Sequence, residues 1–123
     1  MSLRTALLRY GTVGFVATAA HWALLVLLVE LGGVRAWIGS GAGALLGAQV
    51  AFFGNRRYTF GHAGAWRPAW WRFMGTAALG AAVGMGVVAA GVAFGLYYLL
   101  AQALATGLVM LLTFAINRHW TFA

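Results

Sequence analysis

Four long apolar runs follow one another along the chain, separated by short segments that hold most of the charged residues. The runs cover about residues 10–31, 36–54, 73–94 and 96–116. Each is roughly the 20 residues that an α-helix needs to cross about 30 Å of hydrocarbon. The pattern therefore predicts an all-α integral membrane protein with four transmembrane helices. The longest polar link, residues 61–72, is rich in Trp and predicts a short segment lying in the membrane interface.

One short motif closes both the second and the fourth run. Its copies span residues 52–60 and 114–122, and both read F-x-x-N-R-x-aromatic-T-F. This recurrence indicates a duplicated unit, with repeat 1 at about 9–60 and repeat 2 at about 72–122. Two runs per repeat predict two helical hairpins as parallel repeats within a single domain, 1–123. Both motif copies are then expected on the same side of the membrane.

The arginines predict how the helices are oriented. The chain has 8 basic residues, all Arg, and 1 acidic residue, which gives a formal net charge of +7. Only Glu30 and Arg35 fall on the side opposite the motif copies. Because basic residues are enriched on the cytoplasmic side, the motif side and both termini are expected in the cytoplasm. The motif-side arginines are Arg4, Arg9, Arg56, Arg57, Arg67, Arg72 and Arg118.

Composition excludes several classes of function. The chain is 63% hydrophobic and only 7% charged, so the bilayer is its expected solvent. The Arg residues flank apolar runs, which favours anionic lipid and phosphorylated lipid over nucleic acid as partners. With no Cys, one carboxylate, and His21, His62 and His119 outside metal-ligand spacing, we expect no enzymatic activity, no metal and no cofactor.

Small and polar residues mark the faces of the expected helices. Polar groups in hydrocarbon need partners, so these faces should point into the bundle, either as interhelical hydrogen bonds or as a polar path. Glycine stripes should let helix backbones approach closely. The stripes are Gly39, Gly43, Gly47 and Gly54 in the second run, and Gly80, Gly84 and Gly91 in the third. The polar faces are Gln102, Thr106, Thr113 and Asn117; Gln49, Phe53 and Arg56; and Gly14, Thr18 and His21.

The Asn-Arg pair in each motif copy is the candidate anion-binding feature. The Arg guanidinium matches phosphate oxygens in a bidentate way, and Asn55 and Asn117 add amide hydrogen bonds. A simple interface anchor is the alternative, since Arg, Tyr58 and Trp120 are residue types common at the ends of spans. The duplicated Asn favours binding. A lipid with a phosphate at headgroup depth suits this arrangement.

The motif copies, the four runs and the length resemble the GtrA-like family of small membrane proteins. In that family the motif closes the second and fourth spans, and Arg-Phe or Arg-Tyr opens the first and third. Here Arg9-Tyr10 and Arg72-Phe73 stand at the two openings, and the motif copies stand at the two closings. One departure is the third run, which offers little beyond Thr76 to contact a ligand.

The resemblance implies a role in cell-surface polysaccharide synthesis, by flipping a polyprenyl-phosphate-linked monosaccharide across the cytoplasmic membrane. The sugar lipid is thus the expected partner, with a glycosyltransferase as a possible one. The small size of the chain predicts a homodimer or higher homo-oligomer. The implied phosphate-binding residues are Asn55, Arg56, Asn117 and Arg118, supported by Arg9 and Arg72. The implied substrate path is Gln49, Gln102, Thr106 and His21, and the interface aromatics are Tyr58 and Trp120.

The sequence is also compatible with two other functions. A non-transporting accessory subunit would anchor a glycosyltransferase through its basic face. A small multidrug-type exporter would have a similar size, but it needs a carboxylate deep in the membrane. Glu30 lies about 20 residues beyond Arg9, which places it at the far interface, where it could pair with Arg35. His21 near mid-depth is expected as a neutral, hydrogen-bonded side chain, with a proton relay as the alternative.

Overall fold

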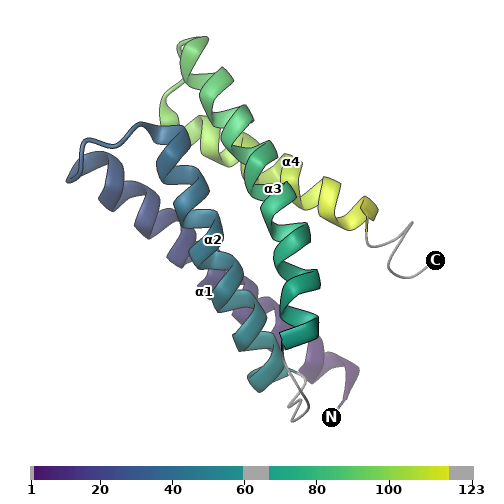
Figure 1. The fold of residues 1–123 in the computed structure, drawn as a ribbon. Helices are drawn as coiled ribbons and strands as arrows, with labels where there is room; N and C mark the ends of the chain where they lie inside the picture. Colours follow the sequence, from purple (N-terminus) through teal and green to yellow (C-terminus); the bar gives the residue numbers. More distant parts are fainter. Residues whose placement is uncertain (1, 60–66, 117–123) are drawn as a thin grey trace.

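The computed structural model describes residues 2–59 and 67–116, which form a bundle of helices (Figure 1). In chain order, the structure contains α1 (Leu3–Glu30), α2 (Ala36–Gly54), the π-helical turn η1 (Asn55–Thr59), α3 (Arg67–Ala93) and α4 (Tyr98–Ile116). Within the described ranges every one of these elements is helical. The prediction of an all-α protein with four long helices in two hairpins is confirmed.

The helices have the length and apolarity that a membrane requires. Three segments are long and apolar enough to span one: Leu3–Glu30, Ala36–Tyr58 and Arg67–Ala93. The fourth helix, α4, is apolar over Tyr98–Thr113 and has 19 residues in all. At about 1.5 Å per residue, α4 is nearly as long as the roughly 30 Å hydrocarbon layer is thick. The chain is therefore a four-helix membrane protein.

Two helices begin earlier than the apolar runs indicate. At the start of α1 the side chain of Ser2 accepts a hydrogen bond from the Thr5 amide at 3.1 Å, which caps the helix. At the start of α3, Pro68 lies in the first turn, where a missing amide hydrogen is tolerated. Residues 67–72 are thus the first turns of α3. The predicted interfacial segment, residues 61–72, therefore overlaps the start of α3, and its residues 61–66 lie outside the described residues.

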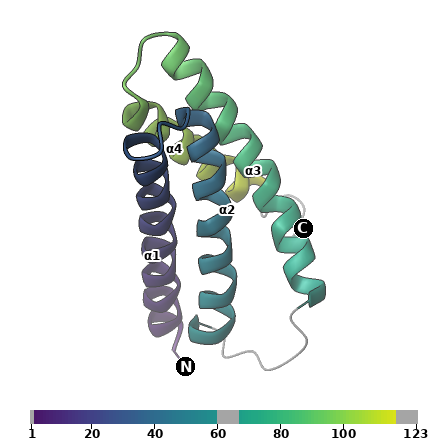
Figure 2. The ribbon, with the colours of Figure 1, turned by 60° about the vertical axis from the view of Figure 1, so that its left-hand side comes forward.

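Each hairpin turns at the end of the bundle opposite the N-terminus, as Figure 2 shows. Gly33 with φ 65° and Gly95 with φ 92° supply the left-handed conformations that the two connections need. Helix α1 packs against α2, α2 against α3, and α3 against α4. In both views α4 leans away from α1 toward its C-terminal end, and ends higher than the level at which α1 begins (Figures 1 and 2).

The glycine stripes lie where helix backbones meet. A methyl group on Gly47 would lie 2.9 Å from the carbonyl oxygen of Ala17, and one on Gly43 would collide with the carbonyl oxygen of His21. On the other hairpin, a methyl group on Gly91 would lie 2.8 Å from the Cβ atom of Ala101. Glycine therefore sets the close spacing of α1 on α2 and of α3 on α4, as the stripes indicate.

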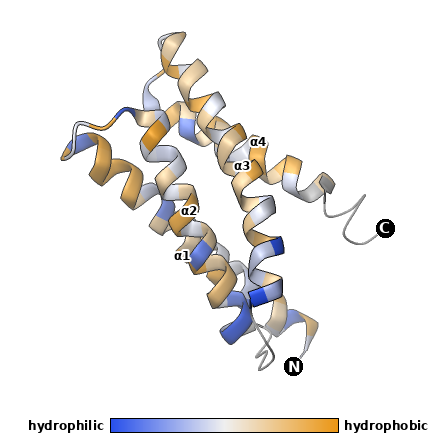
Figure 3. Cartoon of the chain, in the orientation of Figure 1, coloured by the Kyte–Doolittle hydropathy of each residue, from blue (hydrophilic) through white to orange (hydrophobic). Residues whose placement is uncertain are grey.

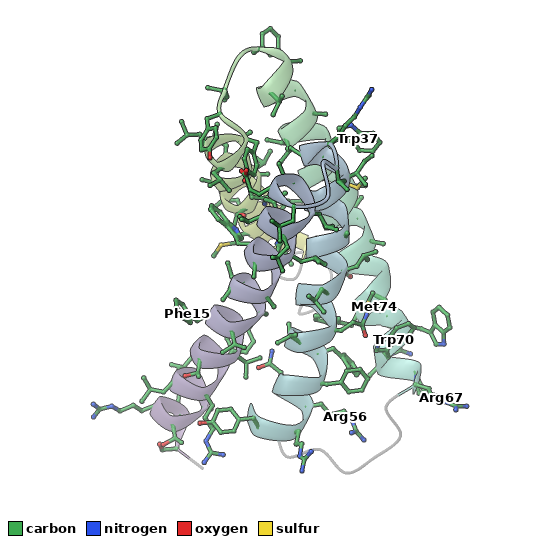
Figure 4. All side chains as sticks on the ribbon, turned by 90° about the vertical axis from the view of Figure 1, so that its left-hand side faces the viewer. Phe15, Trp37, Arg56, Arg67, Trp70 and Met74 are labelled. Carbon is green, nitrogen blue, oxygen red and sulfur yellow. The ribbon has the colours of Figure 1, made fainter. Side chains whose placement is uncertain are left out.

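Hydrophilic residues gather at one end of the bundle. Figure 3 shows them at the start of α1, the end of α2 and the start of α3, while the middles of the helices are mostly apolar. Figure 4 shows Arg56 and Arg67 at this end and Trp37 toward the other. The term basic rim is used below for this end, which comprises Arg4, Arg9, Asn55, Arg56, Arg57, Arg67 and Arg72.

Candidate functional site

A cavity of about 250 Å³ lies between the four helices and is partly open to the surroundings. Its walls are mostly small or apolar side chains, which fits a site inside a membrane. Helix α1 and helix α4 both line it, although these two helices do not pack extensively against each other within the described residues. Polar side chains come from every helix: Thr18 and His21, Ser40, Thr76, and Gln102, Thr106 and Thr113.

A chain of hydrogen bonds crosses the cavity wall from α2 to α4. The hydroxyl of Ser40 donates to Oε1 of Gln102 at 2.6 Å, and Nε2 of Gln102 donates to Oγ1 of Thr106 at 3.0 Å. Ser40 is only 2% exposed and Gln102 only 1%. Because a buried amide without partners is costly in hydrocarbon, these bonds hold α4 against α2 and fix the orientation of the Gln102 side chain.

The cavity threonines differ in whether their hydroxyl protons are already donated within their own helix. Thr18 donates to the Gly14 carbonyl at 2.8 Å, and Thr113 donates to the Val109 carbonyl at 2.7 Å. These hydroxyls are bound within their own helices. Thr106 instead accepts from Gln102, so its own hydroxyl proton stays available to a ligand.

His21 supplies a second polar group to this cavity. Its ring lies beside the backbone of Ser40, and Nε2 has no hydrogen-bond partner among the described residues. The Thr106 hydroxyl is thus a group that can bind a neutral hydroxyl, and His21 adds a buried polar side chain to the cavity wall.

At the basic rim, Arg9 ties α1 to the first motif copy. Its Nη1 donates to the carbonyl oxygen of Tyr58 at 3.2 Å, and its guanidinium carbon lies 4.9 Å from the centre of the Tyr58 ring. Asn55 and Arg56 open the π-helical turn η1, which continues directly from α2. Such turns recur at functional sites because they redirect side chains at the end of a helix. Arg9, Asn55 and Arg56 are thereby brought to one end of the α1–α2 hairpin.

The cavity extends toward the basic rim along two helices. On α3, Phe73 lines the cavity, and Arg72 directly precedes it. On α2, Ala51 lines the cavity, and Asn55 follows about one helical turn later. The cavity lining therefore reaches to within about one helical turn of the basic rim on both helices.

Gln49 takes a different position from the other path residues. Its Oε1 accepts from Nε1 of Trp70 at 2.9 Å, and its Nε2 donates to Sδ of Met74 at 3.1 Å. It is not among the residues that line the cavity. Figure 4 shows Trp70 and Met74 close together on α3 near the basic rim. Gln49 thus joins α2 to α3, while His21, Gln102 and Thr106 lie together in the cavity.

Part of the predicted site lies outside the described residues: Asn117, Arg118 and Trp120. Sequence reasoning did not identify Ser40 as a site residue, although its hydroxyl bonds Gln102. The signal for it was a lone hydroxyl between Gly39 and Gly41, in a run where any polar side chain needs a partner.

Glu30 lies at the end of the bundle opposite the basic rim, as its position in the sequence indicates. Its Oε1 accepts from the hydroxyl of Tyr98 at 2.7 Å, an interaction that joins the end of α1 to the start of α4. The cavity lining holds no Asp or Glu side chain from the described residues. Those same residues contain no cluster of three or more potential metal ligands.

Fold and site together define a small polytopic membrane protein with a mostly apolar cavity that carries a few polar side chains between its helices, and a basic rim at one end. The model of the family GtrA/DPMS, transmembrane domain, matches residues 9–122, so the chain belongs to this family. No curated protein and no solved structure matches the chain. Membership confirms the resemblance and supports a membrane function related to polyprenyl-phosphate sugars.

Proposed function

We propose that the chain translocates a polyprenyl-phosphate-linked monosaccharide across the bacterial cytoplasmic membrane. The cavity between the helices is the observation that carries this proposal. It offers the available hydroxyl of Thr106 and the polar side chain of His21 near the middle of an otherwise apolar bundle. A sugar leaving water loses hydrogen bonds that such groups replace, which lowers the barrier to crossing hydrocarbon.

The phosphate of the lipid binds at the basic rim in this proposal. Arg56 and Asn55 provide the guanidinium and amide donors, and Arg9 and Arg72 lie at the same end on α1 and α3. Asn117 and Arg118 of the second motif copy would add a matching pair. Positive charge at the rim also retains anionic lipid and corresponds to a cytoplasmic location of both termini.

The sugar enters the cavity from the rim, while the polyprenyl chain stays in the surrounding lipid. The lining residues Phe73 and Ala51 stand next to Arg72 and about one turn from Asn55, so phosphate and sugar can occupy rim and cavity together. The cavity is partly open, and the lipid chain needs such an opening. A second copy of the chain, in a homodimer, would complete the wall. No step of this role makes or breaks a covalent bond.

The proposal is tested in liposomes that contain the purified chain and no glycosyltransferase. The assay follows the movement of a labelled polyprenyl-phosphate hexose from one leaflet to the other. Replacing Arg56 with Ala should reduce both lipid binding and movement about tenfold or more, because a hydrogen bond to a charged group contributes about 1.5–3 kcal/mol. Arg35→Ala is the matched control, since Arg35 caps α2 at the opposite end of the bundle.

Three results would distinguish the candidate functions. Movement that depends on Arg56 but not on Arg35 supports translocation. Lipid binding without movement, together with increased activity of an added glycosyltransferase, would instead identify an accessory subunit. If Arg56→Ala leaves both binding and movement unchanged, the assignment of the phosphate to the basic rim is wrong.

A further inference from the structure

The cavity carries polar groups but no formally charged Asp, Glu, Lys or Arg side chain from the described residues. Its polar lining consists of hydroxyls, the amide of Gln102 and the imidazole of His21. The remaining wall is made of Ala, Gly, Phe, Val and Met side chains. Such surroundings replace the hydrogen bonds of a neutral hydroxyl, but they do not replace the hydration of an added ion.

Gln102 is one of the residues that line this cavity. It is 1% exposed, and its oxygen and nitrogen are engaged by Ser40 and Thr106 at 2.6 Å and 3.0 Å. These bonds hold the amide in one orientation, so it cannot turn to meet charges of either sign. The amide is also nearly the same shape as a carboxylate, so replacement by Glu changes the charge with little change in volume.

We infer that this cavity selects lipid-linked sugars by charge, accepting neutral sugars and rejecting acidic and amino sugars, with Gln102 as the specificity-determining residue. The inference rests on the proposed function and deepens it. The phosphate that all these lipids share is held at the basic rim, where Arg56 and Arg72 lie. A carboxylate or ammonium on the sugar is a further charge, and it enters a cavity whose lining, among the described residues, carries no charged Asp, Glu, Lys or Arg side chain.

The experiment compares three synthetic lipids that share one polyprenyl phosphate and differ only in the sugar. These lipids carry a hexose, the corresponding hexuronate and the corresponding 2-amino hexose. Movement between leaflets is measured in liposomes, and competition for binding is measured by native mass spectrometry of the same full-length protein. The wild-type chain should bind and move the hexose at least tenfold better than either charged lipid. This comparison needs no substitution, so it does not depend on whether a variant folds.

The variant Gln102→Glu should change the preference in a defined direction. The new carboxylate pairs with an ammonium group, so the ratio of amino hexose to hexose should rise at least tenfold, while the hexuronate falls further. Gln49→Glu is the matched control. It introduces the same charge at a glutamine that contacts Trp70 and Met74 and does not line the cavity, so it should leave the ratio unchanged.

The possible failures are separable. If the wild-type chain moves and binds all three lipids within twofold of one another, charge selection is wrong and translocation stands. If Gln102→Glu and Gln49→Glu shift the ratio equally, the assignment to Gln102 is wrong. If the hexose lipid binds preferentially but does not move, the translocation proposal fails and the selection stands. If no lipid binds, both proposals fail.

Discussion

Replacing Gly47 with Ala tests the close approach of α1 to α2, on which the shape of the cavity depends. The added methyl carbon would lie 2.9 Å from the Ala17 carbonyl oxygen and 3.3 Å from Cβ of His21, whereas ordinary contacts begin at 3.4 Å. The carbonyl belongs to the backbone and cannot rotate away. The two helices must therefore move apart by about 0.5 Å.

The magnitude follows from two opposing effects. Overpacking of this kind costs about 1–3 kcal/mol, and the better helix propensity of Ala returns at most about 1 kcal/mol. We expect a net loss of roughly 1–2 kcal/mol in the free energy of unfolding. Gly86→Ala on α3 is the control, because a methyl group there meets no atom within 4 Å. It should be neutral or stabilising by up to about 1 kcal/mol.

The assay is reversible unfolding in mixed micelles with a rising fraction of sodium dodecyl sulfate, followed by fluorescence of the 6 Trp residues. Gly47→Ala should shift the midpoint to a lower fraction of the denaturing detergent, and Gly86→Ala should not. Equal midpoints for the two variants would refute the described spacing of α1 and α2.

Three further predictions concern the bond between α2 and α4, the bond between α2 and α3, and the orientation of the chain in the membrane. A double-mutant cycle with Ser40→Ala and Gln102→Leu should give a coupling of about 0.6–1.7 kcal/mol in the same unfolding assay; additive losses would contradict the bond between α2 and α4. Trp70→Phe removes the indole N–H that donates to Gln49, so it should lower the free energy of unfolding by about 0.6 kcal/mol. An unchanged free energy of unfolding would mean that this bond contributes nothing. Because the chain has no Cys, single cysteines at Ser2 and Arg35 report orientation directly. In intact cells an impermeant thiol reagent should label Arg35→Cys and not Ser2→Cys, and the reverse pattern would invert the expected topology.

The helices and the cavity-facing side of α4 were predictable from sequence because they depend on local periodicity. Apolar runs of membrane-spanning length indicated four helices, and an interval of about 3.6 residues per turn placed Gln102, Thr106 and Thr113 on one side. The structure brings all three to the cavity. Capping was less visible, so the extra turns at the starts of α1 and α3 were missed.

The partners of these side chains were not predictable, because they depend on how the helices pack. Nothing local indicates that Ser40 faces Gln102 across the bundle, since the two residues are 62 positions apart and meet only through the packing of the helices. Gln49 lies on the same side of α2 as Arg56, yet α3 is placed so that the Gln49 amide bonds Trp70 and Met74 instead of facing the cavity. Periodicity therefore identified which residues turn inward, and tertiary packing decided which of them reach the cavity.

The most direct test of the account maps where the sugar sits. A polyprenyl-phosphate hexose with a photoreactive diazirine on the sugar is bound to the reconstituted protein and irradiated, and the adducts are located by mass spectrometry. The account predicts adducts on cavity-lining residues such as Thr106 and Met110, and their loss when unlabelled lipid competes. Adducts confined to outward-facing residues such as Phe15, which is 77% exposed, would contradict it.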